Sequence, residues 1–259
     1  MIVKRHVSFR LLWEQLLVIT LVTVFPMPYS TIQAITLDLD DTLWPVWPTI
    51  RKAEAALHAW LQDHAPNTAA QLETPESMRT KRDTLVAEFP HLAHDFSFMR
   101  QEAIRRSLMS GGDDPALAST AYEVFYEARN SVELFDDALP ALQYLAAKYP
   151  IVAISNGTAD IQRVGLAKYF KGAISAAEFG IAKPDPRIFK AAAAAVGVSV
   201  ANVLHVGDDS ALDAVGALQS GMHAAWLNRE GKDWPHDQPE AHHQSLRHVK
   251  SLAELCDLL

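Results

Sequence analysis

Acidic, hydroxyl and amide side chains gather in four short segments of the sequence, each close behind a run of apolar residues. The first segment reads LDLDDTLW and supplies Asp38, Asp40 and Thr42. The other three contribute, in chain order, Ser155, Asn156, Lys183, Asp208, Asp209 and Asp213. Carboxylates and small donors of this kind are typical of metal-assisted chemistry on an anionic substrate.

Several carboxylates close together repel one another and need a cation to balance their charge. Two like charges about 4 Å apart repel by about 4 kcal/mol at an effective dielectric of about 20. Lys183 cannot balance all of the acidic groups, which are Asp38, Asp40, Asp208 and Asp213. Oxygen ligands without cysteine or clustered histidine favour Mg²⁺, which also leaves coordination positions for a substrate phosphate.

The spacing of Asp38 and Asp40 predicts two different roles. If Asp38 ends a strand and Asp40 lies in the following turn, one carboxylate can attack a phosphorus atom while the other reaches the leaving oxygen. Hydrogen bonds to the phosphoryl oxygens would come from Thr42, Ser155, Asn156 or the amide of Gly157, and Lys183. We therefore expect phosphoryl transfer through an aspartyl-phosphate.

The surrounding pattern predicts an α/β fold with a Rossmann-like parallel sheet. Short apolar runs alternate with helical patterns such as 139–148 and 186–196. The candidate strands are 35–39, 151–154, 173–175, 203–206 and 224–227. The functional segments then meet at the carboxyl ends of the strands, where such sheets bind ligands.

A helical insertion is predicted between the first two strands. Residues 49–136 show helical patterns at 51–63, 76–87 and 98–109 and no convincing strand. We therefore assign 35–48 and 137–259 to the core domain and 49–136 to an α-helical cap.

The ordered motifs DLDDT, SNG, KP and GDDxxxD resemble those of the haloacid dehalogenase (HAD) superfamily, and the helical insertion resembles its C1 cap. The resemblance covers about residues 35–259. The core is particularly similar to bacterial phosphatases of riboflavin metabolism, which act on FMN and 5-amino-6-(5-phospho-D-ribitylamino)uracil. The resemblance implies that the protein is a phosphatase that acts on a small phosphorylated metabolite.

The resemblance also implies site roles. Asp38 would be the nucleophile and Asp40 the general acid/base, with Thr42 and Ser155 as phosphate ligands and Lys183 as the balancing charge. Mg²⁺ would be held by Asp38, the backbone carbonyl of Asp40 and Asp208. Asp213 would hold Lys183 or support the metal site, and Asp209 would reach the metal through water.

Several of these residues have a simpler interpretation. Asp209 and Asp213 could cap the helix after Gly207, and Ser155 and Asn156 could form a turn or cap. Trp44 and Trp47 could stack on a substrate ring or only pack the cap against the core. Further cap candidates for the cleft are His94, Phe96, Phe98, Arg100 and Arg105, whereas His205 and His223 are expected to be buried and outside the site.

Other functions remain open. A phosphorylated signalling receiver also combines an aspartate, Mg²⁺, a hydroxyl and a lysine, but it does not explain Asp40 or the insertion. A 2-haloacid dehalogenase would use Asp38 but needs no acid for a halide leaving group. A phosphomutase would use the same residues as a phosphatase.

The composition narrows the classes of binding partner and the cell compartment that we expect. The chain has 259 residues, 49% of them hydrophobic, and a net charge of -8, which does not favour binding to nucleic acid or to an anionic membrane. The single cysteine, Cys256, excludes an internal disulfide and suits the cytoplasm.

The first 34 residues form an extension before the predicted core. Their basic residues and the apolar run 16–25 are similar to a secretory signal, but the run is shorter than the about 20 residues of a membrane span. We favour a start at Met27, and peptides upstream of it in the native protein would contradict that hypothesis.

Overall fold

The core domain is built on one parallel sheet. The computed structural model describes residues 31–236 and 245–259, so most of the predicted N-terminal extension lies outside the described residues. The six strands follow the order β3-β2-β1-β4-β5-β6, and every pairing is parallel. They span β1 (Ala34–Leu37), β2 (Ile151–Ser155), β3 (Gly172–Ser175), β4 (Val203–Gly207), β5 (His223–Leu227) and β6 (Leu246–Val249).

The predicted α/β fold is confirmed, with one additional strand. Each of the five predicted strands overlaps an observed one, whereas β6 was not predicted. Its sequence, Leu-Arg-His-Val, is short and polar in the middle, as an edge strand can be because only one side pairs. Leu37 at the end of β1 lies between Ala153 of β2 and Val206 of β4. The chain segments that leave these strands therefore start side by side.

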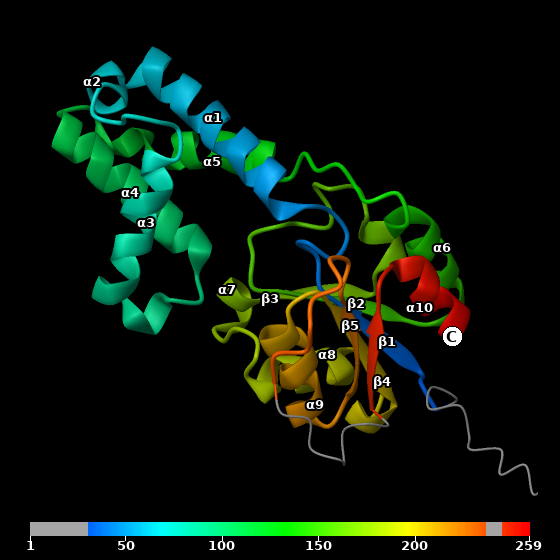
Figure 1. Cartoon of the computed structure of the whole chain (residues 1–259). Coiled ribbons are helices and arrows are strands. Elements are labelled where there is room, and N and C mark those ends of the chain that lie inside the picture. The colour runs from blue at the N-terminus through cyan, green and yellow to red at the C-terminus, as the bar shows by residue number, and fades with distance from the viewer. Residues whose placement is uncertain (1–30, 237–244) are drawn as a thin grey trace, which may run out of the picture.

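Helices cover both faces of the sheet (Figure 1). On one face, α6 (Ala138–Lys148) and α10 (Leu252–Leu258) pack Leu145 and Leu255 against Leu37. On the other, α8 (Pro186–Ala195) and α9 (Gly216–Ser220) pack with Val152 and Ile154. Shorter helical segments are α7 (Ala176–Phe179), the π-helical turn Ser210–Val215 and the 3₁₀ turns Ala167–Tyr169 and Val200–Asn202.

The insertion folds as a helical cap with its own core. It contains α1 (Val46–His64), α2 (Pro66–Ala69), α3 (Ser77–Glu88), α4 (Phe96–Gly111) and α5 (Ala118–Arg129), with 3₁₀ turns at Pro90–Leu92 and Pro115–Leu117. Leu57, Leu61 and Met99 are among its buried side chains. The first cap helix begins at Val46, earlier than the predicted boundary at 49. In Figure 1 the cap stands beyond the end of the sheet to which β1 points.

Within the described ranges, no helix combines the length and the apolar character that a membrane crossing needs.

Leu57→Ala tests the contribution of the cap core. Leu57 is 1% exposed, so its truncation leaves a cavity and should lower the free energy of unfolding by about 2–5 kcal/mol. Urea unfolding followed by circular dichroism measures the loss. Leu139→Ala on α6 is the control, because Leu139 is 39% exposed and should change the free energy by less than about 0.5 kcal/mol. Equal losses in the two variants would contradict a packed cap core.

Candidate active site

The turn after β1 brings Asp38 and Asp40 to the end of the sheet. The backbone N–H of Asp41 donates to the carbonyl of Trp44 at 2.7 Å, and Asp41 adopts a positive φ of 56°. Trp44 is fully buried, and its indole Nε1 donates to Oδ1 of Asp40 at 2.8 Å. Trp44 therefore holds the Asp40 carboxylate by a hydrogen bond and does not line the pocket between Asp40 and the cap.

Lys183 joins two buried carboxylates. Its Nζ lies 2.5 Å from Oδ1 of Asp38 and 2.6 Å from Oδ1 of Asp213. Burial alone would lower the pKa of Lys183, but Asp213 and Asp38 outweigh it and raise that pKa. Burial likewise would raise the pKa of Asp213, yet Lys183 and His205 lower it. The lysine and Asp213 are therefore a charged pair.

His205 lies behind this pair as a hydrogen-bonded core residue. Its Nε2 is 3.1 Å from Oδ1 of Asp213 and its Nδ1 is 2.9 Å from Oγ1 of Thr36. Burial lowers the pKa of His205, which keeps the ring neutral at pH 7. The expectation of a buried, hydrogen-bonded imidazole is confirmed for His205.

Asp38 and Asp208 carry charge that their neighbours do not balance. The hydroxyl of Thr42 lies 3.2 Å from Oδ2 of Asp38 and 3.2 Å from Oδ1 of Asp208, and its one hydrogen can serve only one of them. Burial, with Asp213 and Asp41 adding repulsion, raises the pKa of Asp208 to about 7. Burial also raises the pKa of Asp38, although Lys183 acts against it. An added cation would relieve this repulsion.

The donor set fits a hard divalent cation. Oxygen atoms of Asp38, Asp208 and Asp213 lie within 4.8 Å of one another. Oδ1 of Asp213 is taken by Lys183 and its Oδ2 accepts the backbone N–H of Asp209 at 3.0 Å. Asp213 thus uses both oxygens on protein groups and supports Lys183, whereas Asp208 has the Thr42 hydroxyl, 3.2 Å from its Oδ1, as its neighbour.

Three predicted residues make local contacts that position others. Asn156 clamps the backbone of Lys183, with Nδ2 donating to its carbonyl at 3.0 Å and Oδ1 accepting its N–H at 2.8 Å. Oγ of Ser155 accepts the N–H of Gly157 at 2.9 Å. Oδ1 of Asp209 accepts two backbone N–H groups at the start of the Ser210–Val215 turn, each at 2.8 Å, so Asp209 is a helix cap.

Arg129 is a site residue that the sequence reasoning missed. It ends α5, is 1% exposed, and its Nη2 lies 2.6 Å from Oδ1 and 2.5 Å from Oδ2 of Asp40. A Cβ at Gly157 would come within 2.4 Å of Oδ2 of Asp40, which explains the glycine there. The only sequence signal was the position of an arginine just before the chain returns to the core.

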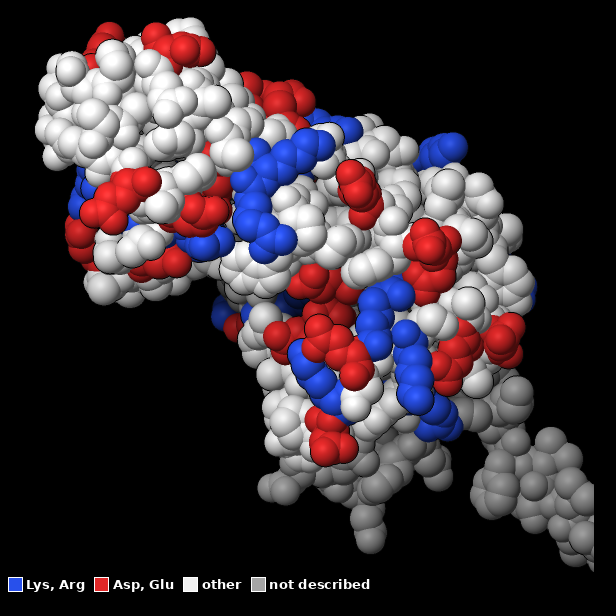
Figure 2. Space-filling model, turned by 45° about the horizontal axis from the view of Figure 1, so that its top comes forward, with Lys and Arg blue, Asp and Glu red and all other residues white. Residues whose placement is uncertain are grey.

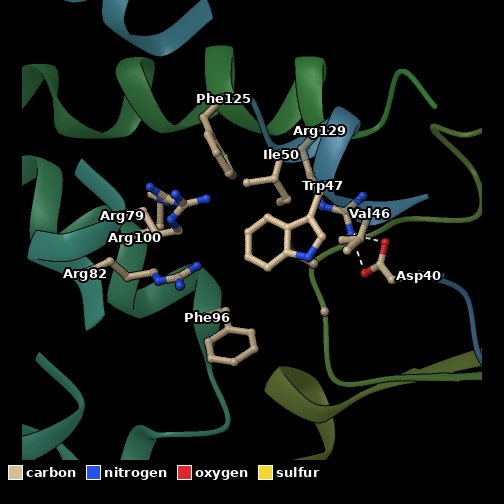
Figure 3. Close-up of a pocket in the computed structure, with 12 residues that line it drawn as sticks. Asp40, Val46, Trp47, Ile50, Arg79, Arg82, Phe96, Arg100, Phe125 and Arg129 are labelled. Atoms are coloured by element: carbon tan, nitrogen blue, oxygen red, sulfur yellow. Dashed lines mark hydrogen bonds and ion pairs between the residues drawn. The ribbon is translucent and has the colours of Figure 1, made fainter. Parts of the chain in front are cut away.

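A pocket of about 640 Å³, counted out to the solvent at its mouth, joins Asp40 to the cap (Figure 3). The predicted candidates Trp47 and Arg100 line it, as does Phe96. Phe98 instead packs against the cap core, and Arg105 pairs with Glu102 at 2.7 Å. The sequence reasoning missed the arginines of α3 that also line it, Arg79 and Arg82.

Charge on the surface is mixed. On the face shown in Figure 2, Lys and Arg side chains lie among Asp and Glu side chains, and no continuous basic surface is visible there. Cationic groups are instead concentrated inside the pocket.

Comparison with known proteins identifies the class. The family model of haloacid dehalogenase-like hydrolases matches residues 32–221. The chain therefore belongs to this family. It is an enzyme, and the phosphatases among its relatives confirm the predicted phosphatase class.

The proteins similar to this chain include phosphatases and a dehalogenase. The 5-amino-6-(5-phospho-D-ribitylamino)uracil phosphatase YigB of Escherichia coli is 32% identical over 81% of this chain and 89% of its own length. A phosphoserine phosphatase of Thermus thermophilus is 32% identical over 50% of this chain and 55% of its own length. The solved structure of a 2-haloacid dehalogenase from Pseudomonas syringae has a TM-score of 0.79 and 36% identity, covering 88% of this chain and 97% of that one.

Gly207→Ala tests the packing behind the lysine. A Cβ there would lie 2.3 Å from the carboxyl carbon of Asp213, so we expect Asp213 to move off Lys183. The free energy of unfolding should fall by about 1–3 kcal/mol, and most of the hydrolase activity should be lost. Gly172→Ala in β3 is the control, because a Cβ there meets nothing within 4 Å. Full activity in Gly207→Ala would contradict this packing.

Proposed function

We propose that the protein is a Mg²⁺-dependent phosphomonoester hydrolase that acts through an aspartyl-phosphate. One observation carries the proposal: two carboxylates at the end of β1 have different partners. Asp38 pairs with Lys183 at 2.5 Å inside the core, while Asp40 faces the pocket and Arg129. These different surroundings support different roles, with Asp38 as the nucleophile and Asp40 as the general acid/base.

The reaction proceeds in two displacements. A carboxylate oxygen of Asp38 forms a bond to phosphorus, the bond from phosphorus to the leaving oxygen breaks, and Asp40 gives that oxygen a proton. Asp40 then takes a proton from a water molecule that attacks phosphorus. Phosphate leaves, and the Asp38 carboxylate is restored.

The other site residues stabilise the negative charge of the phosphoryl group during these steps. Thr42 and Ser155 donate to phosphoryl oxygens, while Lys183, fixed by Asn156 and Asp213, balances their charge. Asp38, Asp208 and the backbone carbonyl of Asp40 would hold Mg²⁺, which supplies positive charge against the phosphoryl group. Asp209, whose Oδ1 caps the following turn, would reach the metal only through water.

For the substrate we propose a flavin-pathway phosphate, FMN or 5-amino-6-(5-phospho-D-ribitylamino)uracil. The support is the YigB relative, which covers most of both chains. The similarity to a solved 2-haloacid dehalogenase favours halide displacement as the second candidate. Asp40 favours the phosphatase, since an alkoxide leaving group needs a proton and a halide does not.

Asp38→Asn should abolish phosphate release, because an amide cannot form the acyl-phosphate. We expect a loss of at least about 10³-fold in kcat, measured as inorganic phosphate from FMN, with the melting temperature as a check on folding. Asp136→Asn, an exposed change outside the site, should keep wild-type turnover. Substantial turnover by purified Asp38→Asn would refute the nucleophile assignment.

A substrate panel separates the candidate functions. It contains FMN, the ribitylaminouracil phosphate, ribose 5-phosphate, phosphoglycolate and 2-chloropropionate, each with Mg²⁺ and with EDTA. We expect phosphate release that EDTA removes and Mg²⁺ restores, with preference for the first two compounds. Chloride release from 2-chloropropionate without phosphatase activity would establish the dehalogenase instead.

A further inference from the structure

Arg100 is a buried cation without a hydrogen-bond acceptor. Its side chain is 2% exposed and lines the pocket, and neither Nη1 nor Nη2 has a hydrogen-bond partner among the described residues. The guanidinium stacks over Phe125, with its central carbon 4.3 Å from the ring centroid, which fixes its plane. Unsatisfied buried donors on a charged group are costly, so an acceptor from outside the chain is expected.

The nearest carboxylate does not supply that acceptor. Glu54 on α1 is fully buried, and its oxygens lie 3.6 Å from Arg100 and 3.5 Å from Arg79 without forming a hydrogen bond to either. Burial lowers the pKa of Arg100 to about 10, so it is still charged at pH 7. One carboxylate therefore stands between two guanidinium groups, and both Nη1 and Nη2 of Arg100 remain without a hydrogen bond to a described residue.

The same pocket presents an aromatic surface. Trp47 is 54% exposed although it lines the cavity, and the guanidinium carbon of Arg79 lies 5.1 Å from its ring centroid. Figure 3 shows its indole between the arginines of α3 and α4 on one side and Asp40 with Arg129 on the other. An exposed, electron-rich indole is suited to stacking on a flat, electron-poor ring.

The pocket extends from Asp40 to these cap residues. Asp40, Gly157 and Thr158 line its core end, and Arg79, Arg82 and Arg100 line its cap end. A substrate with its phosphate near Asp40 therefore extends toward Arg100. Its far end must offer oxygen acceptors and a planar face.

We propose that the cap pocket is a head-group subsite for a planar heteroaromatic ring with carbonyl oxygens. Arg100 and Arg79 donate to the carbonyl oxygens, and Trp47 stacks on the ring. The inference rests on the proposed phosphatase function and deepens it, since it states what distinguishes a good substrate from other phosphomonoesters. A pyrimidinedione ring, alone or within a flavin, has this chemistry.

Arg100→Met in the full chain tests the subsite by comparing two kinds of substrate. FMN and UMP carry the ring, whereas ribose 5-phosphate lacks it. We expect KM for FMN and UMP to rise about ten- to hundred-fold more than KM for ribose 5-phosphate, as the loss of charge-assisted hydrogen bonds predicts. Arg105→Met, an exposed change on the same helix, is the matched control and should leave all three KM values as in the wild type.

Two outcomes would overturn the subsite. In one, Arg100→Met changes KM for ring-bearing and ring-free substrates equally. In the other, only carboxylate-bearing substrates such as phosphoserine are affected, which would assign the pocket to a carboxylate. If Arg100→Met is unstable because Glu54 loses a neighbouring cation, Glu54→Gln with Arg100→Met removes both charges and repeats the comparison.

Riboflavin binding separates this proposal from the proposed function, because riboflavin has the ring but no phosphate. Quenching of its fluorescence by the wild-type protein, weakened about ten-fold or more in Arg100→Met, supports the subsite even if no phosphate release is found. Phosphate release from FMN without any Arg100 dependence of riboflavin binding or KM refutes the subsite and leaves the phosphatase standing.

Discussion

The ion pairs of Lys183 with Asp38 and Asp213 are the interaction on which the site depends. A lysine buried at the carboxyl end of the sheet needs acidic partners to remain charged, and each of these carboxylates in turn needs the lysine. Two neighbouring residues hold this arrangement in place. Asn156 fixes the lysine backbone, and His205 forms a hydrogen bond with Asp213. Asp208 lies outside these two ion pairs, with its Oδ1 3.2 Å from the hydroxyl of Thr42. One buried cation thereby joins two of the three carboxylates and leaves the third with a different partner.

The fold and the core half of the site could be predicted because they depend on local sequence. Apolar runs mark buried strands, and parallel strands bring the residues that follow them to one edge, which is enough to place Asp38 beside Lys183 and Asp208. The contact of the Asn156 side chain with the backbone of Lys183 was not predicted, since it depends on how two loops fold against each other.

The cap half could not be predicted in the same way. Arg129 meets Asp40 across 89 positions of sequence. Arg79 and Arg82 reach the pocket from α3, whose buried side chains are Met78 and Leu85. No spacing rule links such residues, because their encounter depends on how cap helices pack and how the cap sits over the sheet. For Trp44 the sequence left ring stacking and packing open, and the structure buries this side chain completely.

The cap has its own buried core, separate from the two apolar layers that hold the sheet. Most of the pocket side chains project from cap helices, whereas Asp38 and Asp40 follow a strand of the sheet. Replacing Trp47 or an arginine of α3 therefore disturbs no strand packing and leaves Lys183 and its partners in place. Selection can therefore alter which substrates bind without altering the residues that follow the strands. A few substitutions in the cap are enough for new substrate preferences to evolve.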